Sequence, residues 1–383
     1  MPDDTLTMIP GPTPVLPSIL EALGRPTTSH QAPSFVEGYR ECLENLRRIV
    51  FAESAQPFVV SGAGTLAMEM ALVNLLGPGE RLLIVSQGFF GDRWAQIAEA
   101  FGIPHLLLQA EWGQAVEPAR VLEALDSESF AAVAMTHVDT STGTAAPVEQ
   151  YCDRLRGRDE LLLLDGVCAT AGIEERFDGW GLDVLLTGAQ KALGTPPGVA
   201  ILLASGRAMD KRAALGSVPA YYADLLRWKP VMDNPALYFS TPPVNEIMAL
   251  LEATRIIVGE GLDERFRRHA QIARAIRAGF ASLGLEIFTS ADCRADTLSV
   301  LIYPEGIEDA PFRAAVAARK VVIAGALGPL AGKACRVGHM GNIGVDEVVR
   351  TLSALGEALG QLGHTADTDA AVAAARAGKW GHS

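Results

Sequence analysis

The chain has 383 residues, of which 49% are hydrophobic, and this is enough apolar material for the core of a two-domain globular protein. The net charge of −13 and the lack of a basic cluster exclude the usual kind of nucleic-acid-binding protein. No apolar run reaches the roughly 18 residues that a membrane-spanning helix needs, and five scattered cysteines form neither a CxxC zinc motif nor a disulfide framework. We therefore expect a protein of the reducing cytoplasm, with no bound metal, no nucleic-acid partner and no membrane partner.

Residues 59–203 alternate between helix-like and strand-like segments. Helical spacing of apolar residues predicts helices at residues 64–76, 90–101, 118–125 and 148–155. Short apolar runs predict strands at residues 59–60, 81–85, 105–108, 131–136, 160–164, 184–186 and 199–203. Because these strands are apolar throughout, they predict an α/β fold with a mainly parallel sheet and helices on both faces.

The last third of the chain has a different pattern. Helix formers dominate residues 243–283, with an interruption at 259–261, and a further helix is predicted at 345–362. Strands are predicted at residues 298–302, 321–324 and 335–337. We place a boundary near residue 250, between a large domain of residues 15–250 and a small C-terminal α+β domain of residues 251–383 that also holds residues 1–14.

Two details of this last third also lead to expectations. The alanine-rich stretch at residues 367–377 predicts a poorly packed terminal helix. The basic run at residues 265–268 follows Glu260, Asp263 and Glu264, and this mixture of charges predicts a solvated helix face.

Ligands of open α/β sheets bind at the carboxyl ends of the strands, so polar turns that follow apolar runs are candidate sites. The first such turn, SGAGT at residues 61–65, joins a strand to a helix. Its small residues and the helix N-terminus favour an anion such as a phosphate. The alternative is a tight turn without a ligand, since the spacing of a dinucleotide motif or a P-loop is missing.

Asp165 and Lys191 lie in two further turns. Asp165 ends a run of four leucines, where a carboxylate needs a cation or hydrogen-bond donors, unless it only caps the next turn. Lys191 lies beside Gln190 between two apolar runs, where burial would lower the pKa of its amine and favour attack on a carbonyl. The alternative for Lys191 is an exposed turn residue.

The fourth turn, HVDTSTG at residues 137–143, is either a helix-cap cluster or part of a ligand site. His137 and Asp139 could be metal ligands, but no third ligand is spaced to join them. In chain order, the turns therefore offer an anion site, an acidic group and an amine. Pyridoxal 5′-phosphate (PLP) needs these groups for its phosphate, its pyridinium nitrogen and its carbonyl carbon.

The chain resembles the class V aminotransferases of fold type I over nearly its whole length, and in particular the alanine–glyoxylate and serine–pyruvate aminotransferase family. The motifs that carry this resemblance are PGPTP at 10–14, QGFFGDRW at 87–94, HVDTSTG at 137–143, GAQKALGTPPG at 188–198, LYFSTPPV at 237–244 and RVGHMG at 336–341. The resemblance implies a large PLP-binding domain with a mainly parallel sheet and a smaller C-terminal α+β domain.

The resemblance also implies roles for residues around the cofactor ring. Lys191 would be the Schiff-base lysine, and Gln190 would contact the phosphate or another part of the cofactor. Asp165 would pair with the pyridine nitrogen. Val167 and Phe90 would pack on opposite faces of the ring.

The phosphate and the ring hydroxyl have matching residues as well. Ala63, Gly64 and Thr65 match the turn that cradles the phosphate, although Ser or His often occupies flanking positions in relatives. Ser141 matches a residue near the ring hydroxyl.

Three more residues are assigned by resemblance. Tyr238 and Thr241 match a pair that reaches the phosphate of the neighbouring subunit, which implies a homodimer with shared active sites. Arg336 matches the arginine that binds the substrate carboxylate through its planar guanidinium.

The implied activity is the transfer of an amino group from a small amino acid of the alanine or serine type to a 2-oxo acid such as glyoxylate or pyruvate. Alternatives are a pyridoxamine–pyruvate, a ureidoglycine–glyoxylate or a 2-aminoethylphosphonate aminotransferase. A PLP-dependent lyase or cysteine desulfurase would need a loop cysteine shortly before Arg336, and residues 324–333 contain none. A non-catalytic scaffold would be expected to have lost Lys191 or Asp165.

Overall fold

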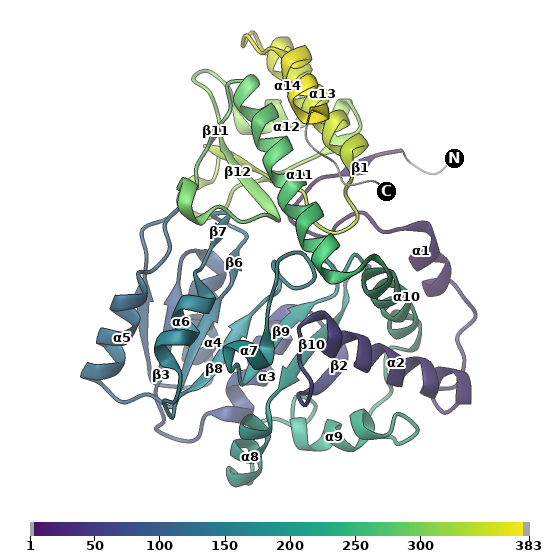
Figure 1. Ribbon diagram of the computed structural model, residues 1–383, viewed down its shortest axis with the longest axis vertical. Coiled ribbons are helices and arrows are strands. Elements are labelled where there is room, and N and C mark those ends of the chain that lie inside the picture. Colours follow the sequence, from purple (N-terminus) through teal and green to yellow (C-terminus); the bar gives the residue numbers. More distant parts are fainter. Residues whose placement is uncertain (1–3, 378–383) are drawn as a thin grey trace.

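The computed structural model describes residues 4–377, so residues 1–3 and 378–383 of the predicted small domain lie outside the described part. A seven-stranded sheet forms the centre of the larger part of the molecule (Figure 1), in the order β2-β10-β9-β8-β5-β3-β4. Its strands are β2 (Gln56–Gly62), β3 (Leu82–Ser86), β4 (His105–Gln109), β5 (Ala132–Thr136), β8 (Leu161–Asp165), β9 (Val184–Gly188) and β10 (Gly198–Ala204).

Only β10 runs against the other strands of this sheet. It pairs antiparallel with β2 and with β9, whereas the remaining neighbours pair in parallel. The prediction of a mainly parallel sheet is therefore confirmed. The carboxyl ends of all strands except β10 lie at one edge, and the register there pairs Asp165 with Thr136 on one side and with Leu186 on the other.

Helices cover this sheet because its central strands are buried at every residue, which requires apolar neighbours on both faces. Helix α3 packs against β9 and β10, and α4 packs against β3. The helices of this part are α1 (Pro17–Leu23), α2 (Pro33–Ile49), α3 (Gly64–Leu75), α4 (Phe89–Ala100), α5 (Pro118–Ser127), α6 (Val148–Leu155), α7 (Phe177–Trp180), α8 (Gly206–Ala214), α9 (Leu225–Asp233) and α10 (Val244–Glu260). The predicted helices between residues 64 and 155 are confirmed to within two residues at each end.

A smaller antiparallel sheet, in the order β11-β12-β15-β14, lies within residues 286–338. Its strands are β11 (Glu286–Ile287), β12 (Leu298–Ile302), β14 (Ala324–Gly325) and β15 (Ala334–Gly338). The helices around it are α11 (Leu262–Ser282), α12 (Asp309–Ala318), α13 (Val345–Gln361) and α14 (Thr368–Arg376). Figure 1 shows these elements above the seven-stranded sheet, with α11 running down between the two parts. The division at residue 250 stays a prediction, and this position lies inside α10.

The strand expected at residues 321–324 is wrong as a single element. Residues 321–322 form β13 (Val321–Val322), which pairs in parallel with the N-terminal β1 (Leu6–Thr7). Strand β14 follows after one residue and pairs with β15 instead. Two partners on different sheets thus divide the apolar run, and sequence pattern alone carries no information about either partner.

The terminal helix α14 corrects another expectation, because it is well packed. Ala371 and Ala375 are fully buried, and the helix lies against α11 and α13. Their small side chains allow the close approach of the helix backbone.

The expectation that residues 265–268 form a wholly solvated helix face is also wrong, because Arg265 is fully buried. Its guanidinium donates to the carbonyl oxygens of Ala171 and Ala192 at 2.6 Å each and forms an ion pair with Glu260 at 2.7 Å. Arg267 lies on the solvated side of the same helix and pairs with Glu264. Arg265, on the buried face of α11, therefore holds the loop that follows Lys191 through the carbonyl oxygen of Ala192.

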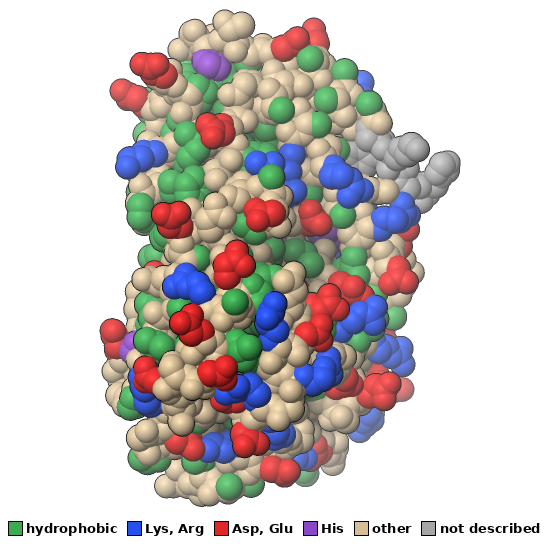
Figure 2. All heavy atoms as spheres, turned by 60° about the vertical axis from the view of Figure 1, so that its left-hand side comes forward, with side chains coloured by type: hydrophobic (Ala, Val, Ile, Leu, Met, Phe, Trp, Pro, Cys, Tyr) green, Lys and Arg blue, Asp and Glu red, His purple; other side chains and the backbone are tan. Residues whose placement is uncertain are grey.

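The outer surface of the protein carries charges of both signs. Figure 2 shows Lys and Arg side chains interspersed with Asp and Glu on the face that it presents. Within residues 4–377, the structure contains no helix long and apolar enough to cross a membrane.

Candidate active site

A cavity of about 300 Å³ lies at the edge where the parallel strands end. It is lined by the turns after β2, β8 and β9, by the first turns of α3 and α4, and by an N-terminal segment at residues 11–12. The residues predicted from sequence that line it are Ala63, Gly64, Thr65, Phe90, Asp165, Val167, Gln190 and Lys191. Turns that are as much as 128 positions apart in the chain therefore meet around one space, whose volume is at the lower end of the range for small-molecule sites.

Lys191 is partly buried, and its amine donates to the carbonyl oxygen of Pro10. Burial lowers the pKa of this amine, and the charge of Arg336 adds to the effect, while Cys168 and Asp165 oppose it. The N-terminal segment also fixes the turn, because the Thr13 hydroxyl donates to the Lys191 carbonyl oxygen at 2.7 Å. An amine with a lowered pKa is more often neutral, as nucleophilic attack on a carbonyl requires.

The N-terminal segment leaves no spare room beside Lys191. A Cβ atom at Gly11 would lie 2.5 Å from Cδ of Lys191, and Gly11 has a φ of +111°, which side chains of L-residues rarely allow. Glycine is therefore required at this point for the backbone to approach the lysine.

Asp165 is buried at the end of β8, and one of its carboxylate oxygens, Oδ1, accepts a hydrogen bond from the Val167 N–H at 2.8 Å. Burial raises the pKa of this carboxyl group to about 7, with a further contribution from Asp139 and Glu175, while the Val167 N–H opposes the rise. Within the described residues, Oδ2 has no hydrogen-bond partner. A cationic N–H donor in the cavity, such as a protonated pyridine ring, would therefore fit beside it.

Val167 and Phe90 both line the cavity and supply apolar faces for a flat ring. The turn at residues 63–65 is in contact with Val167, since a Cβ atom at Gly64 would lie 2.7 Å from its Cγ2. This turn begins α3, and the first turn of a helix leaves backbone N–H groups without partners inside the helix. Together with the cavity volume, these features fit PLP, whose ring Val167 and Phe90 would hold and whose phosphate the start of α3 would bind.

The HVDTSTG turn caps a helix through Asp139 and also lines the cavity through Val138 and Thr140. Oδ2 of Asp139 accepts from the backbone N–H groups of Phe90 and Gly91, at 2.8 and 2.9 Å, at the start of α4. Burial raises the pKa of the Asp139 carboxyl group, and these hydrogen bonds oppose the rise. Ser141 is fully buried and does not line the cavity, and its hydroxyl donates to Asp139 and accepts from the Phe89 N–H. The turn thereby sets the position of Phe90.

His137 is not directed toward a metal site with Asp139, because its Nδ1 lies 2.8 Å from Glu175 Oε1. Across residues 4–377 there is no group of three or more side chains that could hold a metal ion.

Arg336 on β15 borders the cavity without lining it. Its Nε donates to the Gly325 carbonyl oxygen at 2.9 Å, and its Nη1 lies 3.3 Å from the carbonyl oxygen of Thr140, which does line the cavity. Burial lowers the pKa of this guanidinium. The predicted pair Tyr238 and Thr241 lies elsewhere: both are exposed, 3.4 Å apart through their hydroxyl groups. A single chain does not bring them to the cavity.

Several lining residues were missed by sequence reasoning, namely Gly11, Pro12, Met68, Arg93, Val138, Thr140, Cys168 and Pro197. Most of them lie inside or next to the motifs that carry the resemblance, so their position was a usable signal. Met68 lies one helical turn after Gly64, on the same face of α3.

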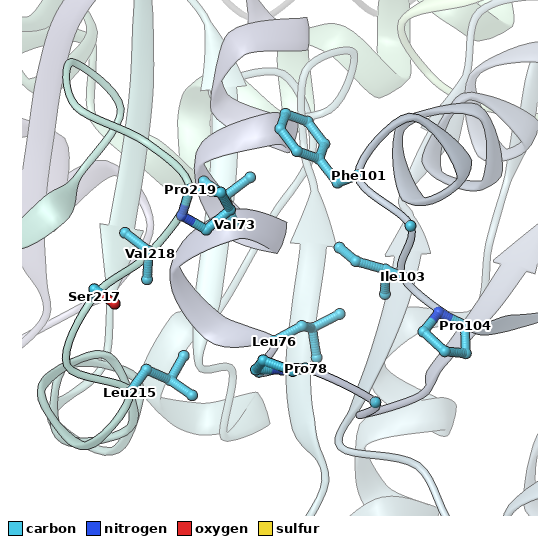
Figure 3. A pocket seen from close by; sticks show the side chains of 13 residues that line it. Val73, Leu76, Pro78, Phe101, Ile103, Pro104, Leu215, Ser217, Val218 and Pro219 are labelled. Atoms are coloured by element: carbon cyan, nitrogen blue, oxygen red, sulfur yellow. The ribbon is translucent and has the colours of Figure 1, made fainter.

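A second cavity, of about 360 Å³, lies at the far ends of α3 and α4, and its lining is shown in Figure 3. It is mainly apolar, and the side chains labelled there include Val73, Leu76, Phe101 and Ile103. No titratable side chain lines it. Although this cavity is larger, it offers no titratable groups for chemistry, and the cavity that holds Lys191 is the candidate active site.

The fold and this site define a fold type I enzyme that uses PLP. Residues 19–353 match the family model for class-V aminotransferases, and the chain belongs to this family. The predicted family, fold and cofactor are therefore confirmed.

Individual relatives agree with this assignment. The chain is 35% identical to an uncharacterized aminotransferase of Methanocaldococcus jannaschii, over 94% of this chain and 93% of that protein. It is 32% identical to alanine–glyoxylate aminotransferase 1 of Saccharomyces cerevisiae, over 88% and 92% of the two chains. The crystal structure of ureidoglycine–glyoxylate aminotransferase from Bacillus subtilis superimposes with a TM-score of 0.92 at 28% identity, over 97% of each chain.

Proposed function

We propose that this aminotransferase moves the amino group of a small amino acid, of the alanine or serine type, to glyoxylate or pyruvate. The observation that carries the proposal is the cavity of about 300 Å³ that is lined by both Lys191 and Asp165, as the transfer of an amino group through a bound cofactor requires. The choice of a small amino acid as the donor rests on the similarity to the yeast alanine–glyoxylate enzyme.

Bound PLP supplies an electron sink for the negative charge that develops on the α-carbon of the substrate. Lys191 Nζ is the group proposed to bind the carbonyl carbon of the cofactor and, once displaced, to carry the α-proton. Oδ2 of Asp165 would accept a hydrogen bond from the protonated ring nitrogen of bound PLP. The guanidinium of Arg336 binds the substrate carboxylate, for which its planar donors are suited.

We also propose a homodimer in which Tyr238 and Thr241 complete the active site of the partner. Both residues are exposed in the single chain, and Tyr221 and Leu237 nearby expose further apolar surface. The proposed location, a reducing cytoplasm, rests on the sequence expectation alone.

The shared site can be tested with two inactive variants, K191A and a Y238A/T241A double variant. Mixed and re-annealed subunits should regain about a quarter of the wild-type activity per total site if each hybrid dimer contains one intact site. Absence of any regain, with hybrid dimers demonstrated by mass spectrometry, would contradict the sharing.

A second candidate function is ureidoglycine–glyoxylate transamination, which the similarity to the Bacillus subtilis structure favours. Pyridoxamine–pyruvate transamination remains the other alternative from the sequence. The deciding experiment is a set of single-turnover reactions of the PLP-loaded enzyme with alanine, serine, glycine, ureidoglycine and pyridoxamine, followed by cofactor absorbance. We expect alanine or serine to react fastest. If the enzyme reacts with ureidoglycine or with pyridoxamine but with none of alanine, serine and glycine, the proposal is refuted.

A further inference from the structure

We propose that Arg93 binds the phosphate of the cofactor and supplies the positive charge that the turn at residues 63–65 lacks. This inference rests on the proposed function, because it takes that turn as the phosphate site. The sequence motifs assigned no role to Arg93.

The phosphate site needs a cation that the turn itself does not provide. A phosphate monoester carries a charge of about −1.5 to −2 at neutral pH. The N-terminus of α3 contributes the equivalent of roughly half a positive charge, and the side chains of Ala63, Gly64 and Thr65 contribute none. Among the described residues that line the cavity, the cationic side chains are Lys191 and Arg93. Lys191 would be engaged with the carbonyl end of the cofactor, which leaves Arg93.

Arg93 lies at the phosphate end of the cavity. It projects from the second turn of α4, and its Nη1 lies 3.4 Å from the Thr65 hydroxyl oxygen, at the start of α3. Its guanidinium carbon is 5.0 Å from the ring centroid of Phe90 and 5.2 Å from that of Phe89. Stacking on aromatic rings restricts a guanidinium while its N–H donors stay available at the edge.

The charge of Arg93 is not neutralised inside the chain. Within residues 4–377 its guanidinium makes no ion pair, and the neighbouring Asp92 accepts hydrogen bonds from Ser86 at 2.7 Å and from Gln109 at 2.9 Å instead. Arg265, by contrast, is matched by Glu260. A cation without a counter-charge beside a cavity favours the binding of an anion there.

The anion is the cofactor phosphate rather than a second carboxylate of the substrate. The predicted substrate carboxylate site is Arg336, which contacts the carbonyl oxygen of Thr140. Arg93 instead contacts Thr65, in the turn that would hold the phosphate. Its place therefore corresponds to the phosphate end of the ligand.

The experiment compares the affinity of the apoprotein for PLP and for pyridoxal, which has the same aldehyde ring without the phosphate. Dissociation constants are measured for wild type, R93M, R93Q and R93K. Hydrogen bonds to charged groups are worth about 1.5–3 kcal/mol, so we expect R93M and R93Q to weaken PLP binding roughly 10- to 150-fold. Pyridoxal binding should change less than about threefold, and R93K should lie between wild type and R93M for PLP.

A matched control is R176M, because Arg176 also stacks on an aromatic ring, with its guanidinium carbon 4.7 Å from the centroid of Phe51, but does not line the cavity. It should leave both affinities unchanged. Thermal unfolding of each apoprotein shows that the variants are folded.

Three results would overturn the inference. Equal weakening of PLP and pyridoxal binding in R93M would mean that Arg93 acts only by supporting Phe90. Unchanged PLP affinity, together with a raised KM for a dicarboxylic amino acid such as aspartate, would place Arg93 in the substrate site. If wild type itself binds PLP no more tightly than pyridoxal, the turn at residues 63–65 is not a phosphate site, and the assignment of the cofactor site falls first.

Discussion

Replacement of Asp165 by asparagine should stabilise the apoprotein, although it should abolish efficient transamination. Burial raises the pKa of Asp165 from 3.8 to about 7 in the folded protein. The folded chain therefore keeps this proton up to about pH 7, while the unfolded chain releases it near its ordinary pKa. Ionisation is harder in the folded state, so the free energy of unfolding of the wild-type apoprotein falls as pH rises between these two pKa values.

The magnitude follows from the size of the shift. Each unit of pKa difference corresponds to 1.36 kcal/mol, so the loss approaches roughly 4 kcal/mol above pH 7 as an upper limit. D165N has no proton to release, and its amide oxygen can still accept from the Val167 N–H. The difference in stability between D165N and wild type should therefore be small near pH 4 and should grow until about pH 7, in favour of D165N.

Urea denaturation of both apoproteins at several pH values between 4 and 8 measures this difference. D183N is the matched control, because Asp183 is equally buried but is paired with Arg207 and with the Ser205 hydroxyl, so its replacement should destabilise the protein. A constant difference between D165N and wild type across this pH range would refute the reasoning, as would a wild type that is more stable than D165N at pH 8.

Three further predictions concern the supports of the site. R265M should lose about 2–5 kcal/mol of unfolding free energy, because it leaves the buried carbonyl oxygens of Ala171 and Ala192 without their donor, while the partly exposed Glu260 keeps its ion pair with Arg268. R267M, on the solvated side of α11, should lose about 0.5 kcal/mol or less, and similar losses in the two variants would argue against the buried cluster. G11A should slow covalent capture of PLP by Lys191, because the added Cβ would meet the lysine side chain. G79A is the control, because Gly79 also has a positive φ but has open space around it, so the capture rate should not change. Equal capture rates for the two variants in stopped-flow absorbance would disprove the close approach of Gly11 to Lys191. R336K should raise the KM for the amino donor roughly tenfold or more with a smaller change in kcat, and an unchanged KM would remove Arg336 from the carboxylate site.

The central sheet could be predicted because each of its strands is marked by a short apolar run in the sequence. Four leucines before Asp165 and the apolar run before the Lys191 turn each predict a buried strand, and the shared direction of the strands brings both turns to one edge. The cap at Asp139 was one of two interpretations open from the sequence. The roles of the cofactor residues stay predictions, although the structure places eight of them around one cavity.

Other features could not be predicted because they depend on contacts between distant parts of the chain. The burial of Arg265 depends on the carbonyl oxygens of Ala171 and Ala192, 94 and 73 positions away. Gly11 and Arg93 reach the cavity only through the packing of the N-terminal segment and of α4. The division of residues 321–325 between two sheets likewise depends on β1, at the opposite end of the chain.

Covalent attachment of the cofactor to Lys191 is the claim on which the proposed function depends. Borohydride reduction of the PLP-loaded enzyme, followed by proteolysis and mass spectrometry of the peptides, locates the modified residue. We expect the reduced pyridoxyl group on the peptide that contains residues 188–198, at Lys191. Modification of another lysine, or none at all in an enzyme that still turns over, would contradict the assignment of this site.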